Sequence, residues 1–122
     1  MKLTAITIAT MLALALTSPA QAVNMFAGPL YPTGSDHCEC EIVNISAVKK
    51  TVQVVILDGA GNQLGSFGPT QLAAGSVLSI ASNVAGRQYC KFVGASAQYF
   101  HAVLACFHPA PNDSDFVAVP AR

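Results

Sequence analysis

The chain has 122 residues, of which 52% are hydrophobic and 10% are charged, and its formal net charge at pH 7 is zero. This length is typical of one domain. Six basic and six acidic residues leave no basic stripe to meet phosphates, which argues against a nucleic-acid-binding protein.

Residues 1–22 have the pattern of a secretory signal peptide. Lys2 precedes an uncharged apolar run, Leu3–Leu16, and Ala20-Gln21-Ala22 matches the cleavage site of a signal peptidase. The apolar run is shorter than the roughly 20 residues that span a bilayer. We therefore expect cleavage after Ala22 and a secreted or periplasmic protein, Val23–Arg122, that has no membrane segment once the signal is removed.

Residues 23–36 contain Gly28, Pro29, Pro32 and Gly34. These residues punctuate regular structure, so the segment is predicted to be an extended, loosely ordered lead-in. The remaining residues, 37–122, are predicted to form a single β domain.

The first strand is predicted at residues 38–46. Cys38, Cys40 and Ile42 alternate with Glu39 and Glu41, which places the cysteines on one face and the glutamates on the other. Lys49 and Lys50 are expected at the turn that follows.

The strongest strand prediction is residues 51–57, which are rich in β-branched side chains. The turn at residues 58–62 contains Asp-Gly and Gly-Asn pairs, which tolerate positive φ. Further strands are predicted at 63–67, 76–82 and 88–93, with residues 71–75 as a loop.

Residues 98–107 fit a short helix by composition, but Gly94, Pro109 and Pro111 nearby and the aromatic residues within favour a strand. Residues 115–122 are predicted to close the chain as an edge strand, because Pro120 cannot donate to a ladder. About seven short strands separated by turns predict an all-β, antiparallel, immunoglobulin-like β-sandwich with disulfides. The absence of Trp distinguishes it from antibody-type domains.

The four cysteines are Cys38, Cys40, Cys90 and Cys106. An even number in a small exported domain predicts disulfides. A Cys38–Cys40 bond would close a strained small ring, which leaves two pairings open: Cys40 with Cys90 and Cys38 with Cys106, or the reverse.

A metal site is the alternative interpretation of the residues around the first two cysteines. His37, Cys38 and Cys40 are three ligands within four residues, and the C-x-C spacing suits copper or redox chemistry better than structural zinc. The thiols of such a site would have to escape oxidation in an exported protein, so disulfides are the preferred interpretation.

Other candidate chemistry is weakly supported. The chain contains His101 and His108 but no G-x-S-x-G nucleophile elbow, so hydrolase chemistry is not predicted. The carboxylates of Glu39 and Glu41, or of Asp113 and Asp115, are expected on solvated surfaces.

The N-x-S matches at Asn44 and Asn112 are not expected to be glycosylated. Without Trp, no sugar-binding platform is predicted from the remaining aromatic candidates, Phe26, Tyr31, Tyr89 and Tyr99.

Several short motifs occur together in a recognisable order: C-x-x-x-N-[VI]-S from Cys40, Y-C-[KR]-F around Cys90, and the C-terminal P-A-R. In this order they resemble a family of small exported bacterial β-sandwich proteins without an assigned function. The resemblance covers residues 40–122 and implies that Cys40 and Cys90 are the shared bonded pair, with Cys38–Cys106 as an added bridge. The HC-x-C extension departs from the family pattern, and no catalytic or binding residue is implied.

These observations predict a non-enzymatic binding or structural module without a cofactor. A protein partner is expected either at the edge strand, residues 115–119, or on a face of the sandwich. The alternative function is periplasmic handling of a copper-like metal by His37, Cys38 and Cys40.

Overall fold

A computed structural model describes residues 22–33, 36–107 and 116–122. The expected signal peptide lies outside these ranges except for Ala22. Within them there are eight strands and one 3-10 turn: β1 Val23–Leu30, β2 His37–Asn44, β3 Lys50–Asp58, β4 Gln63–Leu72, β5 Val77–Ser82, β6 Gln88–Gly94, η1 Ala97–Tyr99, β7 Phe100–Phe107 and β8 Phe116–Pro120. No helix among the described residues has the length and hydropathy needed to cross a membrane.

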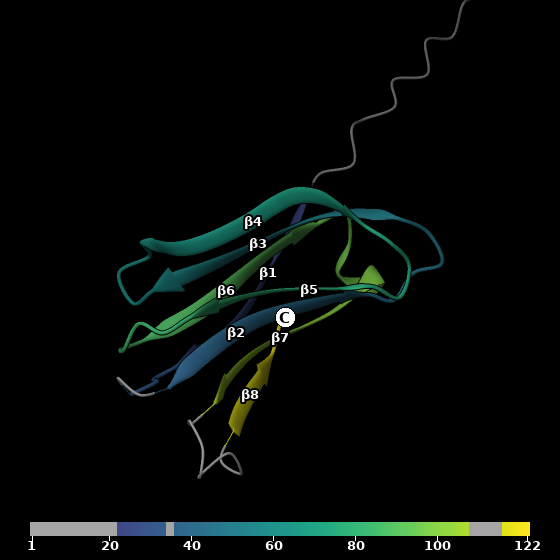
Figure 1. Cartoon of the computed structure of the whole chain (residues 1–122). Coiled ribbons are helices and arrows are strands. Elements are labelled where there is room, and N and C mark those ends of the chain that lie inside the picture. The colour runs from purple at the N-terminus through teal and green to yellow at the C-terminus, as the bar shows by residue number, and fades with distance from the viewer. Residues whose placement is uncertain (1–21, 34–35, 108–115) are drawn as a thin grey trace, which may run out of the picture.

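The strands form two four-stranded antiparallel sheets that face each other (Figure 1). We call them sheet A, with the order β1-β6-β3-β4, and sheet B, with the order β5-β2-β7-β8. The predicted all-β sandwich is confirmed. The predicted strand count was too low, because β1 was not expected.

β1 corrects the prediction for residues 23–36. Val23–Leu30 is extended as expected, but it is an ordered strand that pairs with β6, and Met25 and Ala27 are buried against the core. The glycine and proline signals mark an irregularity within this strand, since the register shifts between Ala27 and Leu30. Gly28, with φ of 110°, occupies that irregularity.

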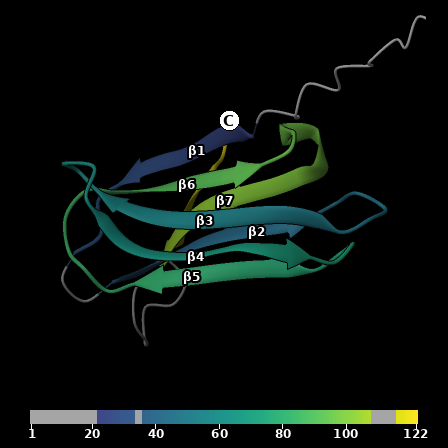
Figure 2. The same ribbon diagram turned by 90° about the horizontal axis from the view of Figure 1, so that it is seen from above.

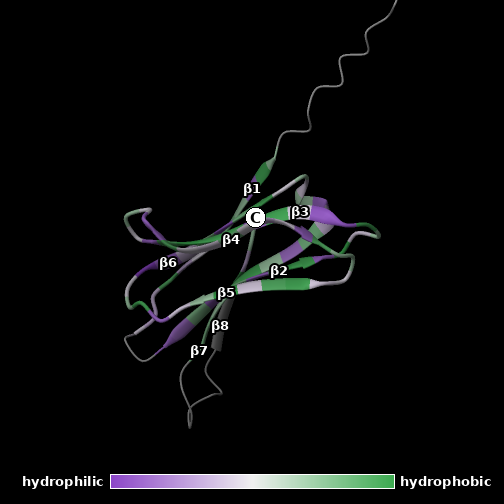
Figure 3. Ribbon diagram, turned by 45° about the horizontal axis from the view of Figure 1, so that its top comes forward, coloured by the Kyte–Doolittle hydropathy of each residue, from purple (hydrophilic) through white to green (hydrophobic). Residues whose placement is uncertain are grey.

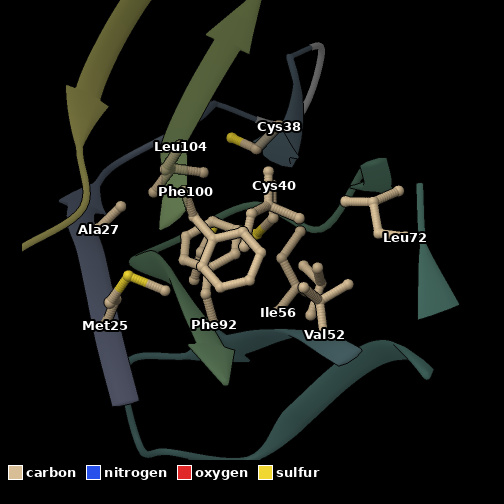
Figure 4. Packing of buried hydrophobic residues seen from close by; sticks show 13 residues of the cluster. Met25, Ala27, Cys38, Cys40, Val52, Ile56, Leu72, Phe92, Phe100 and Leu104 are labelled. Atoms are coloured by element: carbon tan, nitrogen blue, oxygen red, sulfur yellow. A yellow bond between two sulfur atoms is a disulfide. The ribbon is translucent and has the colours of Figure 1, made fainter. Parts of the chain in front are cut away.

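The core lies between the sheets and follows the expected alternation. In β2 every second residue is buried, and Cys38, Cys40 and Ile42 are fully covered. Phe92 of β6 and Leu104 of β7 are also fully buried and meet these residues at the centre (Figure 4). Removal of this apolar surface from water is the main favourable contribution to folding.

The strand order differs from that of an immunoglobulin domain in the positions of β1 and β7. In immunoglobulins the first strand lies beside strand B and the last beside strand F, and a disulfide joins B to F. Here β2 and β6 hold the equivalent inter-sheet disulfide. The first strand, however, lies beside β6, and β7 lies beside β2. The fold is therefore immunoglobulin-like only in the broad sense.

The two sides of the sandwich are closed differently. After β8, Arg122 exchanges two main-chain hydrogen bonds with Phe26 of β1, at 3.0 and 3.1 Å, and Ala121 donates to the carbonyl of Ala102 in β7. The chain therefore links sheet B to sheet A along the β1 and β8 side. β4 and β5 are the last strands of their sheets on the other side (Figure 2).

Candidate functional site

The cluster His37–Glu41 is divided between the two faces of β2. The side chains of Cys38 and Cys40 point into the core and are fully buried, whereas His37, Glu39 and Glu41 lie on the outer face of sheet B. The ligands of the suggested metal site are therefore not brought together.

Both thiols are also consumed by disulfides. Cys40 of β2 bonds to Cys90 of β6 and joins the two sheets, with a Cα–Cα distance of 5.7 Å. Cys38 bonds to Cys106, its register partner on the neighbouring strand β7, with a Cα–Cα distance of 4.0 Å. Of the two pairings left open by the sequence, this is the one that the family resemblance implies.

The outer face of sheet B carries the remaining side chains of the cluster. The Nε2 atom of His37 lies 3.5 Å from the Oε1 atom of Glu39, and its ring stacks on Phe107 with centroids 5.1 Å apart. His101 is exposed on the same face. No three His, Cys, Asp or Glu residues of the described ranges lie close enough together to hold a metal ion. His108, Asp113 and Asp115 fall outside those ranges.

The first N-x-S match, Asn44-Ile45-Ser46, is a structural turn. Asn44 is fully buried, and its side-chain Nδ2 donates to the carbonyls of Leu72 and Val48. Its Oδ1 accepts from the main-chain N–H and the hydroxyl of Ser46. All four hydrogen-bonding positions of the amide are thus used, which leaves none for a glycan.

Asp58 organises the turn between β3 and β4. Its carboxylate accepts hydrogen bonds from the main-chain N–H groups of Ala60 and Asn62 and from the Asn62 side chain. The Asn62 side-chain bond is the main cause that holds the pKa of Asp58 below its usual value. All of these hydrogen bonds lie within the turn, and none of them involves another ionisable group.

The aromatic candidates do not form one binding platform. Tyr89 is the second residue of β6 and Tyr99 follows the end of that strand, so they lie near its opposite ends. The ammonium group of Lys50 lies 3.9 Å from the Tyr99 ring centroid, and the Arg87 guanidinium lies 5.2 Å from that of Tyr31. Each of these two rings thus has a cation beside it, although Tyr31 is still 65% exposed.

A groove of about 520 Å³ lies on the outer face of sheet A, where β3 begins and β4 and β6 end. This volume is within the range of small-ligand sites. The side chain of Gln71 donates to the Thr51 hydroxyl at 2.7 Å on the groove floor. The residues that give the groove its chemistry are Lys49, Thr51, Gln53, Pro69, Gln71 and Val93.

Lys49 is the exposed cation of this groove, because the ammonium group of Lys50 lies over Tyr99. None of the described residues that line it carries a carboxylate. The groove was not predicted: Lys49 and Lys50 were expected at a turn, and their adjacency is the only signal of it in the sequence. Most of the residues that line the groove come from three strands, β3, β4 and β6, so it can be recognised only once their register is known.

The charges of the described residues are separated between the sheets. On the side of sheet A, Lys50 is the first residue of β3, Lys49 directly precedes it, and Lys91 lies on the outer side of β6. Glu39 and Glu41 lie on the outer side of β2 in sheet B. Asp58, the acid of sheet A, lies at the end of β3 remote from the groove.

No family model and no curated protein matches this sequence. Among solved structures, the chain is similar to a protein from Thermotoga maritima described as Thermotoga maritima 1070. The TM-score is 0.55, the sequence identity is 12%, and the match covers 81% of this chain and 91% of the other. At this identity the similarity supports the fold alone.

Proposed function

We propose that this protein is an exported, non-enzymatic binding module that holds an acidic segment of a partner protein in the groove of sheet A. The observation that carries the proposal is a groove of suitable volume whose described lining includes two lysines and no carboxylate. A site with a single sign of charge attracts ligands of the opposite sign and raises their association rate.

The proposed location outside the cytoplasm rests on two independent features. The N-terminal residues have the signal-peptide pattern, and all four cysteines are disulfide-bonded, which is typical of an oxidising compartment. Cleavage after Ala22, a lining residue, would create a new α-amino group at the groove. Export would thus add a third positive charge beside Lys49 and Lys50.

The groove suits a peptide because it combines three kinds of contact. Lys49 offers a charge for a carboxylate, Thr51 and Gln53 offer hydrogen bonds, and Pro69 and Val93 offer apolar walls. Strand addition at residues 115–119 is less favoured, because the chain after β8 is hydrogen-bonded to β1 and β7 along that side.

The test uses a labelled ten-residue peptide of Glu and Ala, a matched peptide of Gln and Ala, and the exported protein. We expect the acidic peptide to shift the backbone NMR signals of Thr51, Gln53 and Val93. Lys49→Glu should weaken its binding by about tenfold or more. Arg87→Glu, which adds the same charge at the opposite end of β6, is the matched control and should change binding much less.

Two results would contradict the proposal. One is the absence of shifts at the groove residues at millimolar acidic peptide. The other is equal binding of the Gln peptide, which would show that the carboxylates are not recognised.

A further inference from the structure

Among the strands that the structure describes, β5 is an edge strand whose outer side has no strand partner. It is the last strand of sheet B, and its described hydrogen-bonding partner is β2 alone. Figure 2 shows it at the margin of the molecule, on the side away from the junction between β1 and Arg122. Its main-chain groups on that side are available to another strand.

The usual protections of an edge strand are missing from β5. Such strands are commonly blunted by charged side chains, proline or a bulge. Residues 59–86 contain no Asp, Glu, Lys or Arg, and β5 contains no proline. Its register with β2 runs without a shift from Val77 to Ser82. Val77 is 53% exposed, and the strand lacks strongly hydrophilic residues (Figure 3).

The neighbouring edge strand β4 is protected by contrast. Pro69 has no N–H to donate, Gly68 has a φ of 94°, and the register with β3 shifts between Val52 and Val54. β5 is therefore the regular and unprotected edge of the described structure.

The sequence of β5 and its flank is self-complementary. Ser76-Val77-Leu78-Ser79-Ile80-Ala81-Ser82 has the same order of small polar and apolar residues when read in either direction from Ser79. Opposed residues in antiparallel strands share a face. An antiparallel pair centred on Ser79 therefore sets Leu78 against Ile80 on the inner face and Val77 against Ala81 on the outer face.

We propose that two copies of this chain form a two-fold symmetric dimer by antiparallel pairing of their β5 strands, with Ser79 on the symmetry axis. A two-fold interface is isologous, so the same strand must be complementary to itself. β5 meets this condition because its order of polar and apolar residues is symmetric about Ser79 and because it carries no charged residue. The paired sheets would form one continuous sheet with β5 of each copy at its centre.

Charges on the outer face do not oppose this arrangement. Glu41 is the register partner of Ser79. The two Glu41 residues of a dimer are therefore separated by three strand spacings, about 14 Å in total. This exceeds the Debye length of about 8 Å at physiological ionic strength, so their repulsion is screened.

Phe67 gives the dimer additional apolar surface. It pairs with Val54, which is fully buried, so its side chain lies on the inner side of sheet A at the same open margin. Phe67 is nevertheless 50% exposed. A second copy at β5 would reduce this exposure.

The experiment measures the molar mass of the exported protein by light scattering over a range of concentrations. We expect the mass to rise from one chain to two. Hydrogen exchange of the amides of residues 77–82 should slow as the dimer forms, while exchange in β4 should change less.

Ser79→Lys places two ammonium groups at the axis and should leave one chain mass at every concentration. Val77→Lys, a second exposed site, should weaken the dimer several-fold. Ser66→Lys adds the same charge to the exposed face of β4 and should dimerise like the unmodified protein. Circular dichroism and thermal unfolding show whether each variant is folded.

A single chain mass for the unmodified protein at the highest soluble concentration would overturn the proposal. So would a dimer that persists in folded Ser79→Lys and Val77→Lys, since its interface would then lie elsewhere. These results are independent of peptide binding at the groove, which lies on the other sheet.

Discussion

The side-chain amide of Asn44 donates a 2.9 Å hydrogen bond to the main-chain carbonyl of Leu72, 28 residues further along the chain. This contact joins the end of β2 in sheet B to the end of β4 in sheet A. The same Nδ2 atom donates at 2.8 Å to the carbonyl of Val48 in the turn before β3. One buried side chain thus fixes the relative positions of three segments.

Asn44→Asp should be strongly destabilising although it hardly changes the volume. An aspartate cannot donate to the carbonyls of Leu72 and Val48, and buried carbonyls without a donor are costly. We expect a loss of about 2–4 kcal/mol in the free energy of unfolding, measured with denaturant. Ser46→Ala, which removes one partner at the turn surface, should cost about 1 kcal/mol. Equal stability of Asn44→Asp and the unmodified protein would contradict the structural role of the amide.

The two disulfides should differ in their susceptibility to reduction. Cys40 and Cys90 are both fully buried, whereas Cys106 is only half-buried. Thiol exchange requires access of the reductant to a sulfur. At increasing dithiothreitol, alkylation and mass mapping should therefore detect Cys38 and Cys106 before Cys40 and Cys90. Simultaneous appearance of all four would show that reduction follows global unfolding.

Removal of the inter-sheet disulfide should be costly. Cys40 and Cys90 are separated by 50 residues, and closing a loop of this length contributes about 4 kcal/mol in the chain-entropy account. We expect the double variant Cys40→Ala, Cys90→Ala to lose most of the stability of a domain of this size, measured by thermal unfolding. Undiminished stability would show that the core alone holds the sheets together.

Gly94→Ala should be destabilising for a packing reason. A Cβ atom at this position would lie 2.5 Å from Cε2 of the buried Phe100 ring. Overpacking of this kind costs about 1–3 kcal/mol. Gly65→Ala, also in a strand but with open space around it, is the control and should be nearly neutral. Phe100→Leu combined with Gly94→Ala should recover part of the loss; a purely additive double variant would argue against the clash.

Asp58 predicts a pH effect. Its folded-state pKa is lowered, chiefly by the hydrogen bond from Asn62, so its contribution to stability is fully present above the unfolded pKa of about 4 and is lost as the pH falls through the folded value. Thermal unfolding between pH 7 and pH 2 should show this loss. Asp58→Asn should lower the melting temperature at pH 7 and reduce the further fall in melting temperature as the pH is lowered. An unchanged fall would exclude Asp58 as its cause.

The strands that could be predicted from the sequence are those whose alternation is set by the core. β2 and β6 alternate without interruption, and β3 is rich in β-branched residues. β1 and the second half of β4 were not predicted, because Gly28-Pro29 and Gly68-Pro69 resemble loop signals. In the structure both pairs occupy irregularities within strands, where pairing with a neighbour outweighs the local preference.

The groove and the unpaired edge of β5 depend on how the strands pair with one another, which the sequence of one strand does not show. Thr51 and Gln71 become neighbours only through the pairing of β3 with β4, and β5 becomes an edge only because β2 has β7 on its other side. The uncharged stretch 59–86 is visible in the sequence. Its meaning depends on the finding that β4 and β5 lie at the same margin of the sandwich.

The separation of lysines on sheet A from glutamates on sheet B gives the molecule an electric dipole across its thickness, although its net charge is close to zero. A charged chromatography matrix responds to the nearest face more than to the net charge, because screening limits the interaction to about a Debye length. The protein should therefore be retained at low salt by both cation and anion exchangers, in opposite orientations. Immobilisation on one type or the other would present sheet B or sheet A to the solvent.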